Sequence, residues 1–166
     1  MFTRIETFAE EWNSERQATL KMLEALNDVS LQQKVDDQGR TLGRIAWHIV
    51  LTLGEMAQSA GLSFAAPGEK EPVPESAQAI AAAYRKTAEA LMTAVQTQWN
   101  DERLQEEIDM YGERWTRGFT LYVLIKHEIH HRAQLTVLMR QAGLKVPGIY
   151  GPAREEWAAY GAPAAE

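Results

Sequence analysis

The amino-acid sequence predicts an all-α protein folded as a four-helix bundle. Two observations favour this class: four long segments repeat apolar residues at helical spacing, and no segment shows a strong strand-like alternation. With 166 residues, of which 45% are hydrophobic, the chain is long enough to bury a core without crosslinks. We therefore expect a single domain over residues 1–166.

The first two helices are expected from about Arg4 to Leu26 and from about Thr41 to Ala60. In the first helix, apolar residues follow one another at steps of three, four and seven, which places them along one face. Thr41 suits the N-cap of the second helix, because its hydroxyl can accept a backbone hydrogen bond. The second helix is apolar most of the way round, so it is expected either at the centre of the bundle or against a second subunit.

A connection rich in proline and glycine spans residues 61–74 and precedes the third helix, expected from about Pro74 to Gln98. The many alanines of this helix favour helix formation and close packing. Residues 99–117 are less regular, and they permit a short extended excursion that turns at Gly112.

The last long helix is expected from about Arg117 to Ala142. Thr116 suits its N-cap, and Gly143 suits the position that ends it, where the backbone turns left-handed. A tight turn and a short helix over residues 153–160 are expected to follow.

Composition excludes several classes of function. The chain has no cysteine, which rules out disulfides, cysteine-ligated metals and a protein thiol nucleophile, so any thiol must arrive with a substrate. A net charge of -6 argues against a nucleic-acid partner, because phosphate recognition depends on clustered lysine and arginine. No apolar stretch approaches the ~18 residues of a membrane span and no signal peptide is evident, so we expect a cytoplasmic protein with no membrane contact.

Three of the four histidines lie within Lys126–Leu135 of the last helix. At about 100° per residue, His127 and His131 are about 40° apart in the middle of the apolar face, so both imidazoles can reach one metal ion. His130 lies at the edge of this face and is a poorer candidate. His48, the remaining histidine, occupies a core position of the second helix. Hydrogen-bonded structural histidines are the alternative, but three histidines on facing helices favour one convergent site.

A site formed by three histidines carries no ligand charge and leaves a coordination position open, as catalytic zinc sites do. Zinc, nickel and iron all accept imidazole, so the ligands alone do not specify the divalent metal. Gln134 falls in the same stripe as the histidines and indicates a polar cavity. Tyr150, in the C-terminal turn, is a candidate to close over that cavity, with simple packing as its alternative role.

The segment from His127 to His131 also matches HExxH, the pattern of zinc metalloproteases. In such an enzyme Glu128 would be the general base, and Glu155 or Glu156 would be candidates for the third ligand. The chain lacks a strand pattern that could align a peptide substrate, and no third histidine follows at the longer metzincin spacing. A protease is therefore the less favoured interpretation.

Several motifs occur together along most of the chain: His48 at the end of GRIAWH, the pattern HxxxHRxQ over residues 127–134, and the ending VPGIYGP over residues 146–152. In this set and order, the sequence resembles the DinB/YfiT-like family of four-helix proteins. The resemblance implies an up-down-down-up bundle, a divalent metal on the three histidines His48, His127 and His131, and a homodimer. Ala133 stands where the family pattern often has glycine, a small-for-small change that leaves the ligands untouched.

Some members of that family are thiol-dependent transferases or isomerases that use a low-molecular-weight thiol such as bacillithiol or mycothiol. The resemblance therefore implies a metal-dependent enzyme, a thiol S-transferase or a related enzyme such as a hydrolase, that acts on a small electrophile. Glu55 and Glu128 are candidate proton acceptors, with a helix-end carboxylate in solvent or an ion pair as the alternative for Glu55. A non-catalytic metal- or small-ligand-binding stress-response protein and a purely structural helical dimer are the alternative functions.

An outward apolar strip on the last helix, together with apolar residues of the second helix, predicts a subunit interface. Packing within the same chain is the alternative. The strip comprises Tyr122, Ile125 and Ile129, with Trp47, Val50 and Leu53 on the second helix.

Overall fold

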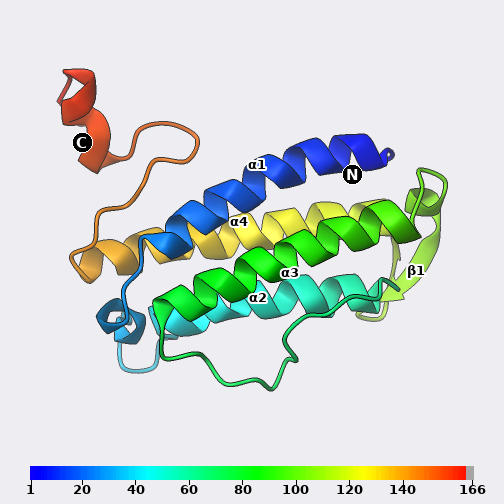
Figure 1. Cartoon of the computed structure of the whole chain (residues 1–166), viewed down its shortest axis with the longest axis horizontal. Coiled ribbons are helices and arrows are strands. Elements are labelled where there is room, and N and C mark those ends of the chain that lie inside the picture. The colour runs from blue at the N-terminus through cyan, green and yellow to red at the C-terminus, as the bar shows by residue number, and fades with distance from the viewer. Residues whose placement is uncertain (164–166) are drawn as a thin grey trace.

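A computed structural model describes residues 1–163 of the chain (Figure 1); residues 164–166, the end of the expected domain, lie outside the described residues. Four long helices dominate: α1 (Ile5–Glu24), α2 (Leu42–Ser59), α3 (Ala77–Gln98) and α4 (Arg117–Gln141). A small hairpin, β1 (Glu107–Met110) and β2 (Glu113–Thr116), precedes α4, and single 3₁₀ segments lie at η1 (Val29–Gln32), η2 (Arg103–Gln105) and η3 (Arg154–Tyr160). The all-α four-helix prediction is confirmed.

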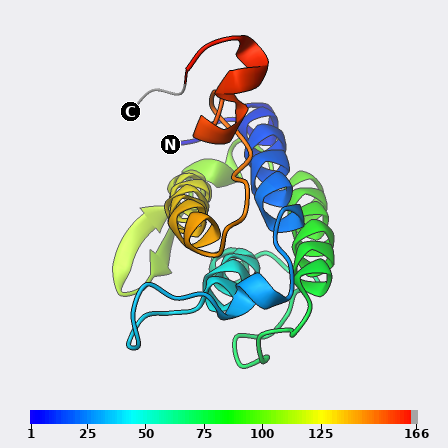
Figure 2. The same cartoon turned by 90° about the vertical axis from the view of Figure 1, so that its left-hand side faces the viewer.

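The helices form an up-down-down-up bundle, as the family resemblance implied. In Figure 1, α1 and α4 run in one direction while α2 and α3 run in the other. Each of α1 and α2 packs against both α3 and α4, so α1 and α2 occupy opposite corners of the bundle seen end-on in Figure 2. Because α2 and α3 are parallel, the connection between them runs back along the length of the bundle. This arrangement sets α2 directly beside α4.

Two of the predicted helix caps are confirmed. The Thr41 hydroxyl accepts a hydrogen bond from the Arg44 backbone N–H at 3.1 Å, and Thr116 caps α4 in the same way. Gly143 follows α4 with φ at 75°, the left-handed geometry expected of a residue that ends a helix. The third helix begins later than expected, because Ser76 rather than the Pro74 region caps its first turn.

The irregular segment before α4 contains the extended excursion that the sequence permitted. Its strands pair antiparallel, with Ile108 opposite Trp115. Tyr111 and Gly112 form the turn with φ of 58° and 82°, the pair of positive values that a tight two-residue hairpin requires. The hairpin lies at the end of the bundle where α4 begins, and it brings the Tyr111 hydroxyl to Glu55 on α2.

The apolar strip predicted as a subunit interface is largely buried inside one chain. Trp47, Val50, Leu53 and Ile125 are each at most 3% exposed. The connection before α3 covers part of α2, since the Trp47 indole N–H donates to the Glu71 carbonyl at 3.1 Å. Packing within the chain, the alternative interpretation, therefore accounts for these four residues.

Two charged residues of α4 are buried in the structure. Glu128 and Arg132 are 2% and 3% exposed, and they face α1 and α3 rather than solvent. The helix is therefore buried on two sides, with histidines toward α2 and a polar network toward α1. No helix among residues 1–163 is both long and apolar enough to cross a bilayer.

Candidate metal centre

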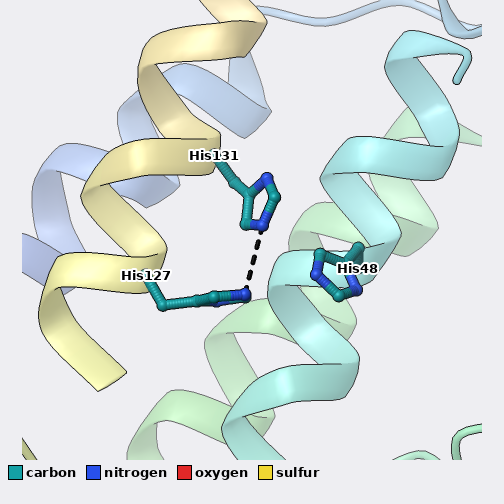
Figure 3. A group of neighbouring side chains, drawn as sticks. All are labelled: His48, His127 and His131. Atoms are coloured by element: carbon teal, nitrogen blue, oxygen red, sulfur yellow. Dashed lines mark hydrogen bonds between the residues drawn. The ribbon is translucent and has the colours of Figure 1, made fainter. Parts of the chain in front are cut away.

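Three histidines meet between α2 and α4. Figure 3 shows His48 extending from α2 toward His127 and His131, which project from successive turns of α4. The ring centroids are 4.4 to 5.1 Å apart, and one nitrogen from each ring lies within 4.8 Å of the others. Helix geometry explains the pair on α4, because residues four apart point the same way. The third imidazole, that of His48, comes from α2, which runs antiparallel to α4.

The spacing of the two α4 histidines suits a shared cation. Their Nε2 atoms are 3.1 Å apart. Two nitrogens bound at about 2.1 Å to a tetrahedral ion stand roughly 3.4 Å apart, so only a small adjustment separates the two arrangements. The group contains imidazoles alone, since no carboxylate of residues 1–163 joins it. Three imidazoles also leave the fourth position of a tetrahedral ion free.

Burial keeps these imidazoles unprotonated, which is the state in which they can bind a cation. It lowers the pKa of both His48 and His127 from 6.5 to about 4, with smaller contributions from the other histidines. Burial also lowers the pKa of His131, although the hydrogen bond to Gln134 partly opposes this shift. At pH 7 all three rings are therefore neutral, which is the form that binds metal without releasing a proton.

Gln134 fixes the orientation of His131. Its Oε1 lies 2.8 Å from Nδ1 of His131, and its amide nitrogen lies 3.2 Å from Nε2 of His130. An acceptor at Nδ1 keeps the proton on that atom and leaves the Nε2 lone pair directed at the centre. The exposed His130 thus contacts Gln134 and stays outside the three-histidine group, as its position at the edge of the face predicted.

We expect Gln134→Leu to weaken metal binding by about 10- to 100-fold, because His131 would lose the acceptor that selects its tautomer. Competition with a chromophoric zinc chelator measures this change. Gln141→Leu, the same substitution two turns further along α4 at an exposed position, is the matched control and should leave the affinity unchanged. Equal affinities for the two variants would show that Gln134 does not orient the ligand.

The hydrogen bonds of Glu128, a predicted proton acceptor, are to residues other than the three histidines. Its Oε1 accepts hydrogen bonds from Thr19 at 2.6 Å and from Tyr84 at 2.8 Å, on α1 and α3. The HExxH interpretation needs this carboxylate beside the metal. The downstream carboxylates are also engaged elsewhere: Glu155 pairs with Arg140, and Glu156 accepts from the backbone of the C-terminal turn. The described residues therefore lack the protease arrangement.

Two other predicted site residues have defined partners. Glu55 is half-buried on α2, and both of its oxygens lie within 3.0 Å of the Tyr111 hydroxyl. Tyr150 donates to Glu15 at 2.8 Å and accepts from Arg132, so it fastens the C-terminal turn to α1 and α4. It does not line the cavity beside His131.

A cavity of about 390 Å³ opens beside His131. Gln134 lines it, as the sequence predicted, but more than half of its lining residues come from the connection before α2 and from the end of α4. Sequence reasoning missed Arg40 here. The available signal was its position directly before Thr41, the N-cap of the helix that carries His48. The lining residues are Val35, Gly39, Arg40, Ile45, His131, Gln134, Val137 and Leu138.

The buried Glu128 gives a prediction about pH. Burial outweighs its hydrogen bonds from Thr19 and Tyr84 and raises its pKa from 4.5 to about 7, and its Oε2 has no partner among the described residues. The folded state thus binds this proton more tightly than the unfolded state. The resulting stability is fully present below pH 4.5 and is lost as the pH rises through 7.

Glu128→Gln cannot lose that proton, so we expect it to gain stability over the native chain between pH 5 and pH 8. The gain should be on the order of 2 kcal/mol. Urea unfolding of both proteins at the two pH values measures it, and contributions from the histidines cancel in the difference. An unchanged gap between the two proteins would mean that Glu128 is ionised in the fold throughout.

Fold and site together define a helical-bundle protein with a candidate three-imidazole metal centre beside a small cavity. The chain belongs to the DinB family, whose model matches residues 1–165. This confirms the resemblance seen in the sequence.

The chain is similar to named relatives over nearly its whole length. It is 50% identical over 161 residues to the uncharacterized protein YrdA of Bacillus subtilis strain 168, and the match covers 97% of this chain and 96% of that protein. The crystal structure of a DinB-like protein from Bacillus cereus is 44% identical, has a TM-score of 0.87, and covers 90% of this chain and 100% of its own. A second DinB-like structure, YjoA of Bacillus subtilis, has a TM-score of 0.68 at 18% identity and covers 86% and 97%; it shows the fold alone.

Proposed function

We propose that this protein is a metal-dependent enzyme that transfers a low-molecular-weight thiol to a small electrophile. The observation that carries the proposal is the convergence of three neutral imidazoles, from His48, His127 and His131, at one place beside a cavity. The donor set suits zinc, nickel or iron in the divalent state. The chain has no cysteine, so the thiol must come from a second substrate.

A divalent cation at this place would act as a Lewis acid that lowers the pKa of a thiol brought to its free position. The residues of the chain orient the ligands and form the adjoining cavity. Gln134 holds His131 in the tautomer that presents Nε2. The apolar side chains of Ile45 and Leu138 line the adjoining cavity.

A thiol that ionises must give its proton to a base. We propose Glu55 for this role rather than Glu128. Glu55 is half-buried, sits two turns beyond His48 on α2, and is already a hydrogen-bond acceptor for Tyr111. Glu128 is enclosed by the core and accepts from Thr19 and Tyr84 instead.

The test of the metal centre is elemental analysis of protein purified without chelators or metal-affinity resin. We expect about one equivalent of a transition metal in the native chain and a loss of most of it in His48→Ala, His127→Ala and His131→Ala. His130→Ala is the matched control, because this neighbouring histidine stands outside the group. Loss of metal in His130→Ala with retention in His131→Ala would overturn the assignment.

Turnover of a small electrophile with a panel of thiols, with and without added metal, tests the enzymatic part of the proposal. We expect a rate above background that depends on both metal and thiol, and a reduced rate in Glu55→Gln with the metal content unchanged. Stoichiometric metal without turnover under any combination would favour the alternative, a non-catalytic metal- or small-ligand-binding protein.

We also propose a homodimer, which rests on membership of the DinB family. Light scattering should then give about twice the chain mass of 18.7 kDa. A mass equal to one chain would overturn this proposal but would leave the proposal of a metal centre unaffected.

A further inference from the structure

The cavity beside the histidines combines an apolar wall with a single fixed positive charge. Val35 and Val137 stand at its rim, 64% and 52% exposed, and Ile45 and Leu138 form its floor, each at most 7% exposed. Arg40 is the only residue of its lining with a permanent charge. A volume of about 390 Å³ lies near the lower end of the range for small-molecule sites, about 300–1,000 Å³. The space therefore suits a small molecule with an apolar body.

Arg40 is available to such a molecule. It takes part in none of the ion pairs or side-chain hydrogen bonds found among residues 1–163, although Asp36 and Asp37 lie close in sequence. Asp36 instead accepts from the Gln38 backbone N–H at 2.9 Å. An arginine with no carboxylate partner at the edge of an apolar cavity matches a ligand that carries its own anion.

The positive charge also lies close to the metal centre. Arg40 and His131 line the same cavity, so a ligand held by Arg40 lies beside one of the three histidines. The guanidinium of Arg40 and the imidazole of His131 therefore lie on two sides of the same cavity.

We propose that this cavity binds the electrophilic substrate as a small apolar monocarboxylate, with Arg40 pairing with the carboxylate and the apolar body lying over Ile45 and Leu138. This places the uncharged end beside His131. A monoanion fits better than a dianionic phosphate, because one arginine supplies the charge and Asp36 and Asp37 lie in the same connection. The assignment of the ligand as a substrate rests on the proposed function; the binding site does not.

The test compares 4-phenylbutyrate with its uncharged analogue 4-phenylbutyramide, which has nearly the same shape. Binding of each to the full chain, with and without zinc, is measured by titration calorimetry. We expect the carboxylate to bind about tenfold more tightly than the amide, and this preference to persist without zinc. Equal binding of the two probes, or a preference that vanishes when zinc is removed, would overturn the proposal, the latter because the carboxylate would then be a metal ligand.

Two variants locate the probe. Arg40→Gln should reduce the preference for the carboxylate to nearly onefold while leaving the metal content unchanged. Arg44→Gln is the matched control: it removes the same charge one turn further along from an exposed position that does not line the cavity, so most of the preference should remain. Equal losses in both variants would show a general charge effect and no specific pairing.

Val137→Trp, at the exposed rim, should weaken both probes alike by filling the cavity. Unchanged binding of both probes in this variant would place them elsewhere and overturn the proposal. Failure of the proposed function has a different signature: no thiol is transferred with any metal, although binding of the carboxylate still depends on Arg40.

Discussion

Arg132→Ala is expected to lower the free energy of unfolding by about 3–5 kcal/mol. Arg132 is 3% exposed, and its guanidinium pairs with the buried Glu15 of α1 at 2.5 Å. It also donates to the Glu15 carbonyl at 3.1 Å and to the Thr19 hydroxyl at 3.0 Å. Removing one partner of a buried ion pair leaves the other charge in the core without compensation, so the loss exceeds the net contribution of the pair.

Urea unfolding at pH 7 measures this loss. Arg140→Ala is the matched control, since Arg140 pairs with Glu155 at 2.8 Å on the same helix but is 38% exposed. An exposed pair of this kind contributes about 1 kcal/mol or less. The double variant Glu15→Leu with Arg132→Met should recover part of the stability, because neither charge then remains in the core. Similar losses in the two single variants would mean that the α1–α4 ion pair is hydrated.

Gly118→Ala is expected to lower the free energy of unfolding by about 3 kcal/mol, the upper end of typical overpacking costs. In an ordinary helix the same change would add roughly 1 kcal/mol of stability, because alanine is the better helix former. Here a Cβ would stand 1.9 Å from the Phe2 carbonyl oxygen and 3.2 Å from that of Leu104. Both obstacles are backbone atoms, so the N-terminal segment must move.

That movement would also break the hydrogen bond from the Phe2 N–H to the Gly118 carbonyl, at 3.2 Å. Thermal and urea unfolding both report the change. Gly68→Ala is the control, since its Cβ would find no atom closer than 3.9 Å, and it should alter stability by less than about 0.5 kcal/mol. A Gly118→Ala variant at least as stable as the native chain would contradict the close contact between the N-terminal segment and α4 at Gly118.

The sequence predicted the main helices and the three histidines because both follow from local spacing. His127 and His131 are four residues apart, and such pairs point the same way on any helix. The choice of His48 followed from its position among core residues. Thr41 and Thr116 were predictable caps for the same reason, since a cap depends on its own helix alone.

The second buried side of α4 was not predictable in this way. Glu128 and Arg132 look like surface residues by periodicity, and only tertiary contacts with Thr19, Tyr84 and Glu15 make their burial favourable. The apolar strip on α4 and α2 was ambiguous for a related reason. Periodicity shows that a face is buried, but it does not show whether the same chain or another covers it.

The cavity wall combines residues of long helices with residues of an exposed connection, and the two kinds of segment tolerate change differently. The three histidines sit on long helices whose packing fixes them, whereas Val35 and Arg40 belong to a solvent-exposed connection that bears little of the core. Substitutions and changes of length are tolerated more readily in such connections than in helices. Val35 and Arg40 can therefore change in evolution more readily than the three histidines.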